Sequence, residues 1–166
     1  MIKMNIRHAI LTDSAQIAEI YNYYILNTHH TFETEPLSAE EMKERIVENS
    51  ENYPFLIAEF EGELQGYVYA TQFKLRQAYK HSAEVSIYVR NQAKQKGIGS
   101  ALYKKLLEEL AETDVHAIMA GISLPNEASV KFHEKLGYEK VAHFKEVGYK
   151  LGRWVDVGFW EMLNRF

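Results

Sequence analysis

Residues 83–124 read AEVSIYVRNQAKQKGIGSALYKKLLEELAETDVHAIMAGISL and carry the clearest periodicity in the chain. Apolar and polar side chains alternate over 83–90, which is the pattern of a strand with one buried face. Residues 97–112 repeat apolar side chains at helical spacing and predict an amphipathic helix, and residues 115–124 return to a strand pattern. The stretch therefore predicts a β-α-β unit whose first loop contains Gly97 and Gly99.

The segments on either side of this unit complete a mixed α/β fold. Those before it are predicted as a strand over 4–11, a helix capped by Thr12 or Asp13, a helix that begins in the capping-box sequence Ser38–Glu41 and runs to about Asn49, and a hairpin of strands 55–61 and 64–73. Those after it are predicted as a helix over 127–136 capped by Asn126 and strands over 138–150 and 153–163, with a turn at Leu151-Gly152. Because strands and helices are interspersed in this order, we expect an α/β sheet with helices against its faces.

Length and composition fit one globular domain. The chain has 166 residues, of which 46% are hydrophobic and 25% charged, so we expect a single domain over 1–166. Its 19 basic and 23 acidic residues give a net charge of −4, so no general positive field attracts nucleic acid or an anionic membrane. The sequence contains no cysteine, no secretory signal and no run of about 18 apolar residues. We therefore expect a cytoplasmic protein without disulfides or a membrane-spanning helix.

The loop Lys94-Gln95-Lys96-Gly97-Ile98-Gly99-Ser100 joins the predicted strand to the predicted helix. Glycine lets the backbone approach a ligand closely, and amides at a helix N-terminus bind phosphate through hydrogen bonds and the helix dipole. The loop lacks the glycine-lysine pattern of triphosphate hydrolases, and a dinucleotide fingerprint would need a third glycine where Leu102 stands. On the glycines alone, a diphosphate cradle and an ordinary strand-to-helix turn both remain open.

The spacing of this loop resembles the acyl-coenzyme A loop of the general N-acetyltransferase (GNAT) superfamily, [Gln/Arg]-x-x-Gly-x-[Gly/Ala], with Lys94 at the first position. Further segments resemble the phosphinothricin N-acetyltransferase family: 32–36, Tyr79 with 83–89, 124–130, 133–138 and 148–157. The resemblance implies a GNAT-like acyl-CoA N-acyltransferase fold with a mostly antiparallel central sheet and helices on both faces. It also implies a homodimeric enzyme that moves the acetyl group of acetyl-CoA to the α-amine of a small amino-acid-like acceptor. Phosphinothricin, methionine sulfone and methionine sulfoximine are acceptors of this type.

The resemblance further implies two acid-base residues. Glu84 lies on the non-core face of its strand and matches the family's general base, which takes a proton from the acceptor ammonium directly or through water. His133 stands where the superfamily commonly has a tyrosine that protonates the departing thiolate, and an imidazole can donate or accept a proton there. From the pattern alone, Glu84 is also readable as a solvated sheet residue and His133 as a structural histidine.

The same resemblance implies the binding residues. Those expected to hold acetyl-CoA are Ile87, Tyr88, Val89, Lys94, Gln95, Lys96, Gly97, Ile98, Gly99, Ser100, Asn126 and Ser129, with a backbone amide such as that of Val89 facing the thioester oxygen. Those expected to hold the acceptor are Phe32, Lys74, Arg76, Tyr79 and Val157. Lys74 and Arg76 suit a carboxylate or phosphinate, although a solvated basic loop is an alternative. Asn126 is equally suited to capping a helix.

The sequence argues against some other chemistries and leaves two other functions open. The seven histidines show no metal-ligand spacing, so we expect no metal, and the Gly-x-Ser-x-Gly elbow of serine hydrolases is missing. An acetyltransferase for a protein N-terminus or a polyamine remains an alternative, as does a non-catalytic module that senses acyl-CoA. Trp154, Phe159 and Trp160 in the last strands are candidates either for the dimer contact or for the core.

Overall fold

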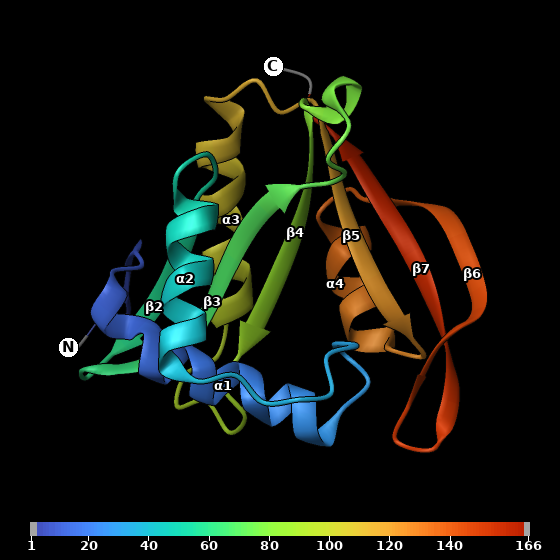
Figure 1. Cartoon of the computed structure of the whole chain (residues 1–166). Helices are drawn as coiled ribbons and strands as arrows, with labels where there is room; N and C mark the ends of the chain where they lie inside the picture. Colours follow the sequence, from blue (N-terminus) through green and yellow to red (C-terminus); the bar gives the residue numbers. More distant parts are fainter. Residues whose placement is uncertain (1–2, 165–166) are drawn as a thin grey trace. The chain divides into compact units, whose positions relative to one another are not determined.

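The computed structural model describes residues 3–164 and contains the predicted order of elements (Figure 1). The strands are β1 Asn5–His8, β2 Phe55–Phe60, β3 Glu63–Gln72, β4 Ser82–Val89, β5 Ala117–Leu124, β6 Glu139–Lys150 and β7 Arg153–Leu163. The helices are α1 Ser14–Asn27, α2 Ala39–Ser50, α3 Ile98–Ala111 and α4 Glu127–Lys135, with short 3-10 turns at Leu11–Asp13 and Gln77–Tyr79. The mixed α/β class is thus confirmed.

The seven strands form one sheet in the order β1-β2-β3-β4-β5-β7-β6. Strands β4 and β5 run parallel, whereas β1 with β2, β2 with β3, β5 with β7 and β6 with β7 are antiparallel, so the expected mostly antiparallel sheet is confirmed. The chain divides into two compact units. The first unit holds residues up to 23, 36–71 and 86–114, and the second holds 24–35, 72–85 and residues from 115 onward.

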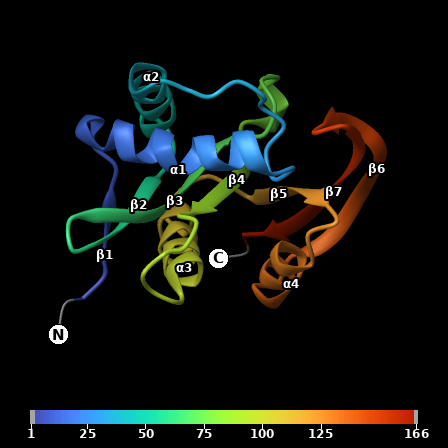
Figure 2. The same ribbon diagram turned by 90° about the horizontal axis from the view of Figure 1, so that it is seen from below.

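In the first unit, helices cover both faces of the strands. Figure 2 shows α1 and α2 on one side of β2 and β3, and α3 on the other. Residues 55–58 of β2 are consequently all buried, as are Ile17 of α1, Met42 of α2 and Leu106 of α3. Burying such side chains stabilises a fold by about 1.5–3 kcal/mol each. This packing fixes the end of β4 and the beginning of α3, between which the glycine loop runs.

Two local signals explain where helices begin in the first unit. The Ser38 side chain accepts a hydrogen bond from the Glu41 amide, and the Glu41 carboxylate accepts one from the Ser38 amide, so the predicted capping box is confirmed. Strand β1 is shorter than the predicted 4–11. The Asp13 carboxylate accepts hydrogen bonds from the Ile10 amide and the Arg7 guanidinium, and these contacts turn the chain out of the sheet into a 3-10 turn.

In the second unit, β5 is the central strand. It pairs with the beginning of β4 on one edge and along its whole length with β7 on the other. Buried Ile118, Ile122, Tyr138 and Trp160 form its core, and the Trp160 indole donates a hydrogen bond to Glu134 of α4. Leu151 and Gly152 have positive φ angles at the predicted β6–β7 turn. Within residues 3–164, no helix is long and apolar enough to cross a bilayer.

Candidate active site

The predicted coenzyme loop in the first unit leads directly into α3. Gly97 is the N-cap residue, with φ +78°, a left-handed conformation that side-chain-bearing residues adopt at a cost of about 1–2 kcal/mol. The amides of Ile98, Gly99 and Ser100 are the first three of the helix, and such amides have no partner within an α-helix. Because these donors and the helix dipole face the same point, the loop has the chemistry of a phosphate cradle.

Neighbouring strands anchor this loop. The Lys94 amide donates to the buried side chain of Gln65, at 2.9 Å. Ile98 is also buried and packs at Gly66, where a Cβ atom would lie 3.2 Å from the Ile98 side chain. Gly66 thereby gives room both to Ile98 and to the backbone of β4. Ile98 therefore serves here as an anchor for the loop.

The charges on the loop differ in their surroundings. The Lys94 ammonium forms an ion pair with Glu63, at 2.7 Å, and this pair raises the pKa of Lys94 and lowers that of Glu63. Glu63 of β3 thus partly neutralises the charge of Lys94, a contact that the sequence does not predict. Gln95 is half-buried, and Lys96 and Ser100 are exposed.

Strand β4 also carries the predicted acid-base residue Glu84, in the second unit. Glu84 pairs in register with Met119 of β5 and is half-buried, on the face opposite to buried Ala83 and Val85. The predicted alternation of β4 is confirmed for these residues. Burial raises the pKa of the Glu84 carboxyl, and the charge of Lys74 partly opposes that rise. A carboxylate with a raised pKa is a stronger base than a solvated one.

Gly121 of β5 makes space for this carboxylate. A Cβ atom at Gly121 would lie 3.1 Å from Oε1 of Glu84 and 3.2 Å from the ring of Phe159. Gly121 is not among the residues predicted from the sequence. The signal that indicates it is a lone glycine inside a strand, which often marks the close approach of another group.

A group of aromatic rings lies between Gly121, which adjoins Glu84, and the predicted acceptor loop. The Phe73 ring contacts Phe159 and Tyr79, each at a centroid distance of 6.0 Å, and Phe159 in turn contacts Phe144. Lys74 lies 5.2 Å from the centroid of Phe73. Lys74, Leu75, Arg76 and Tyr79 line one open depression, so three of the predicted acceptor residues come together. Cations beside aromatic rings suit an anionic group that is attached to an apolar chain.

The other two predicted acceptor residues also lie in the second unit. Phe32 is 40% exposed, and its ring lies against Gly148 of β6. Val157 is half-buried on β7, in register with Phe144 of β6 and Ser123 of β5. Val157 is two residues from Phe159 along β7, so the two side chains share a face of the strand.

Helix α4 positions the remaining candidates. The Asn126 side chain accepts a hydrogen bond from the Ser129 amide at 3.2 Å, so the predicted helix cap is confirmed. His133 is buried, and its Nδ1 lies 2.8 Å from the Ser129 carbonyl oxygen. Because a carbonyl can only accept, Nδ1 carries the proton and Nε2 the lone pair of the neutral ring. Burial lowers the pKa of His133, opposed in part by the bond to Ser129, so the neutral ring is favoured.

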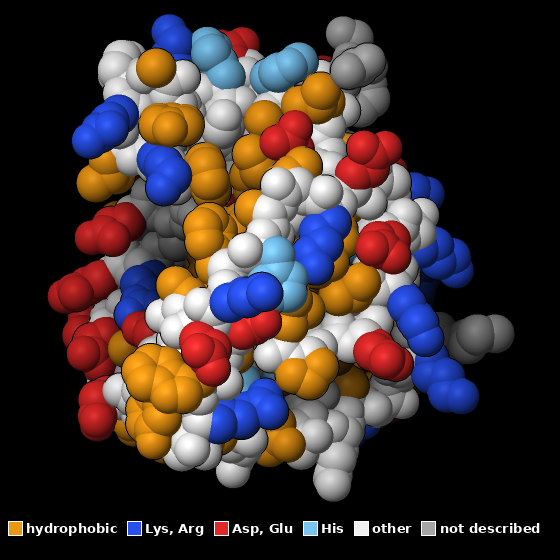
Figure 3. All heavy atoms as spheres, turned by 90° about the vertical axis from the view of Figure 1, so that its right-hand side faces the viewer, with side chains coloured by type: hydrophobic (Ala, Val, Ile, Leu, Met, Phe, Trp, Pro, Cys, Tyr) orange, Lys and Arg blue, Asp and Glu red, His pale blue; other side chains and the backbone are white. Residues whose placement is uncertain are grey.

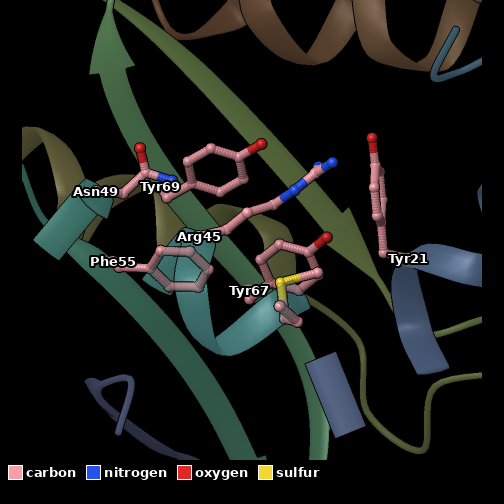
Figure 4. Close-up of a pocket in the computed structure, with 7 residues that line it drawn as sticks. Tyr21, Arg45, Asn49, Phe55, Tyr67 and Tyr69 are labelled. Carbon is pink, nitrogen blue, oxygen red and sulfur yellow. The ribbon is translucent and has the colours of Figure 1, made fainter. Parts of the chain in front are cut away.

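A separate group of aromatic and polar side chains in the first unit was not predicted from the sequence. Tyr21, Arg45, Asn49, Phe55, Tyr67 and Tyr69, with Met42, surround a small cavity (Figure 4). Its volume of about 10 Å³ is close to that of a single water site. Tyr67 stacks with Phe55 and Tyr69, and its burial raises its pKa well above the usual value. This cavity is therefore too small for an amino acid or a coenzyme.

Within 3–164, no three histidine, aspartate or glutamate side chains gather in an arrangement that could hold a metal ion. The polar groups of the two units are instead amide donors suited to phosphate, a half-buried carboxylate and a cationic loop.

Comparison with known proteins identifies the family. Residues 6–159 match the model of the acetyltransferase (GNAT) domain. The phosphinothricin N-acetyltransferase of Streptomyces viridochromogenes is 38% identical over 158 residues, covering 95% of this chain and 86% of that protein. The L-methionine sulfoximine/L-methionine sulfone acetyltransferase of Salmonella typhimurium is 32% identical over 164 residues, covering 96% and 94%.

A solved structure extends this likeness to three dimensions. The phosphinothricin acetyltransferase from Sinorhizobium meliloti, in complex with AcCoA, superposes with a TM-score of 0.92 at 35% identity, covering 96% of this chain and 88% of that one. The resemblance drawn from the sequence motifs is thus confirmed: the chain belongs to the GNAT acetyltransferase family, together with the phosphinothricin N-acetyltransferases.

Proposed function

We propose that this protein transfers the acetyl group of acetyl-CoA to the α-amine of a small amino-acid-like acceptor of the phosphinothricin, methionine sulfone or methionine sulfoximine type. The observation that carries the proposal is the half-buried Glu84 carboxylate, whose pKa burial raises while Lys74 opposes the rise. Relatives named for acetyl transfer to phosphinothricin and to methionine sulfoximine support the acceptor class. The family model over 6–159 supports treating the chain as a single catalytic domain.

Proton removal is the first requirement of this reaction. An amine with a pKa of about 8 to 10 is mostly an ammonium ion at neutral pH and has no lone pair for attack. Glu84 accepts that proton, directly or through a water molecule, and the freed nitrogen attacks the thioester carbon. The new C–N bond replaces the C–S bond, and the products are the N-acetyl amine, the thiol of coenzyme A and one proton.

His133 serves as a second proton acceptor in this proposal. Its Nδ1–H donates to the Ser129 carbonyl, and its lowered pKa favours the neutral ring at pH 7. Little of His133 is therefore in the imidazolium form that an acid needs, whereas the lone pair on Nε2 of the neutral ring can accept a proton. This supports the alternate-base role over protonation of the departing thiolate.

The coenzyme is held by three sets of residues in the proposal. Amides of the 95–100 loop bind the diphosphate at the N-terminus of α3, which Gly97 opens with its left-handed conformation. Asn126, which also caps α4, and Ser129 contact the pantetheine arm. The backbone of Ile87, Tyr88 and Val89 lines the thioester, with the Val89 amide facing its oxygen. Acetyl-CoA supplies an activated acyl carbon and a good leaving group.

The acceptor lies among the cationic and aromatic side chains of the second unit. Lys74 and Arg76 bind its carboxylate or phosphinate, and Phe32, Tyr79 and Val157 form the apolar walls. Support comes from the single depression that Lys74, Arg76 and Tyr79 share and from the attraction between Lys74 and Glu84.

We extend the proposal to a homodimer that works in the cytoplasm. Large apolar side chains are more than 45% exposed along β6 and β7, namely Val141, Phe144, Val147, Tyr149, Leu151 and Trp154. Figure 3 shows hydrophobic side chains at the surface on the side that carries these strands. A patch of this kind is typical of an interface between copies of a chain. Trp160 is buried and belongs to the core. The absence of cysteine suits a reducing compartment.

An acceptor panel tests the proposed activity. Thiol release from acetyl-CoA is measured with phosphinothricin, methionine sulfone, methionine sulfoximine, ordinary amino acids, peptides with free N-termini, and polyamines. We expect the first three to have the highest kcat/KM. Preference for peptides or polyamines would contradict the acceptor class, and binding of acetyl-CoA with no acetylation of any amine would indicate a sensing module instead.

A further inference from the structure

Strand β6 contains a buried lysine that the proposed reaction does not use. Lys150 is 4% exposed, and its ammonium donates hydrogen bonds to the carbonyl oxygens of Thr31, at 2.7 Å, and Tyr24, at 3.5 Å. Lysine is almost never buried unless its charge has partners. Burial lowers the pKa of the Lys150 ammonium, and attraction to Glu33 partly opposes that fall. Lys150 is therefore held in place by the end of α1 and by the segment that follows it.

These contacts join the end of α1 to the segment that follows it. Tyr24 belongs to the last turn of α1, where the helix dipole favours a cation, and Thr31 lies in the irregular stretch beyond the helix. In addition, Nε2 of His29 lies 3.1 Å from the main-chain oxygen of Lys150. Both the side chain and the main chain of Lys150 thus lie against residues 24–31, directly before Phe32.

The ring of Phe32 lies against the same strand. It rests at Gly148, which is two residues before Lys150. A Cβ atom on Gly148 would overlap two carbons of that ring, closer than real Cβ contacts come. Gly148 therefore provides the surface on which the ring rests, and no other residue type leaves this space. Phe32 is 40% exposed, so one part of its ring packs while the rest faces outward.

We propose that Lys150 and Gly148 are positioning residues for acceptor recognition: Lys150 fixes the backbone before Phe32, and Gly148 seats its ring, so that the ring forms a rigid apolar wall against the acceptor's side chain. Lys150 acts through Phe32 and touches no substrate. The inference rests on the proposed function, because it takes Phe32 as a wall of the acceptor pocket. It predicts that this contact governs acceptor affinity and leaves acetyl-CoA affinity alone.

The test compares Lys150→Met with Lys145→Met, which removes an exposed lysine from the same strand. Loss of a charged hydrogen bond corresponds to a factor of roughly ten or more in an equilibrium constant. We therefore expect Lys150→Met to raise the acceptor KM about tenfold, with kcat within a few-fold and the KM for acetyl-CoA unchanged. Lys145→Met should match the wild type. An unchanged acceptor KM in Lys150→Met would overturn the inference.

A double-mutant cycle tests whether the rise in acceptor KM caused by Lys150→Met depends on the Phe32 ring. In a Phe32→Ala background, Lys150→Met should raise the acceptor KM no further, because the ring that it positions is gone. An equal rise in both backgrounds would contradict the positioning role. Gly148→Ala, which leaves the buried lysine intact, should raise the acceptor KM by the same route and serves where Lys150→Met folds poorly.

A measurement without substrate separates this inference from the proposed function. Amide hydrogen exchange over residues 28–36 should be faster in Lys150→Met than in Lys145→Met or the wild type. Equal exchange would overturn the positioning contact whatever the activity. Faster exchange in a protein that acetylates no amine would instead support the contact and refute the proposed function.

Discussion

At the scale of single residues, the pKa of Glu84 is set by two opposing influences, burial and the charge of Lys74. Glu84 accepts a proton only when it is ionised, so kcat should rise with pH through its raised pKa. Lys74→Met removes the influence that lowers this pKa, and the acidic limb of the kcat profile should therefore move to higher pH. Arg76→Met removes a cation from the same loop that is not among the charges acting on Glu84, and should leave the limb in place. If the acidic limb of the kcat profile does not move in Lys74→Met, the assignment of this limb to Glu84 is contradicted.

The pKa of His133 leads to a prediction about stability. Because the folded-state pKa is lowered, the unfolded chain binds more protons below about pH 6.5, and stability falls as pH drops through that value. His133→Asn removes this titration, so its free energy of unfolding should decline less between neutral and acidic pH. Urea denaturation at neutral and at acidic pH measures this change in the free energy of unfolding for each protein. His30, whose pKa burial also lowers, leaves a remaining slope of the same sign in the variant. Identical pH dependence in the two proteins would refute the account of His133.

At the scale of elements, the loop into α3 depends on the left-handed conformation of Gly97. Gly97→Ala should cost about 1–2 kcal/mol of stability and weaken acetyl-CoA binding, because the first amides of the helix shift. Gly62→Ala is a matched control: Gly62 has the same φ of +78° in the β2–β3 turn, and both positions have open space for a Cβ. It should lose similar stability but keep its affinity for acetyl-CoA in calorimetry. Equal affinities in both variants would show that the loop does not hold the coenzyme.

The elements also show how far the sequence could be interpreted. Alternation over 83–90 and the caps Ser38 and Asn126 are local signals, so β4, α2 and α4 were predicted close to their observed bounds. Strand β1 was predicted too long because Asp13 bonds to Arg7 and Ile10, contacts that no periodicity encodes.

Some residues of the candidate site stand out in the sequence, and others do not. Glu84 and the glycine loop stand out in the sequence because of their place in a strand and before a helix. Gly121, the partner of Lys94 and the burial of Lys150 did not stand out, because each depends on which strands pair and in what register. Tertiary contacts of this kind have no local signature.

At the scale of the whole molecule, the exposed apolar residues of β6 and β7 lead to a prediction about assembly. If they form the contact between two copies, Trp154→Lys should weaken the dimer about 30-fold or more, because a buried aromatic at such a contact contributes about 2 kcal/mol or more. Val47→Lys changes a large exposed apolar residue on α2 and should leave the mass of the dimer in solution unchanged. Light scattering over a range of concentrations measures both. A wild-type mass of one chain at all concentrations would contradict the homodimer.

The central claim is that the Glu84 carboxylate removes the proton from the acceptor amine. The most direct measurement is kcat for Glu84→Gln beside calorimetric titration with acetyl-CoA, with Glu139→Gln, an exposed glutamate on β6, as the control. General-base catalysis typically contributes a factor of about 10²–10⁴, so kcat of Glu84→Gln should fall by that factor while acetyl-CoA still binds as to the wild type. Glu139→Gln should keep its activity. Wild-type turnover in Glu84→Gln would remove this carboxylate from the mechanism.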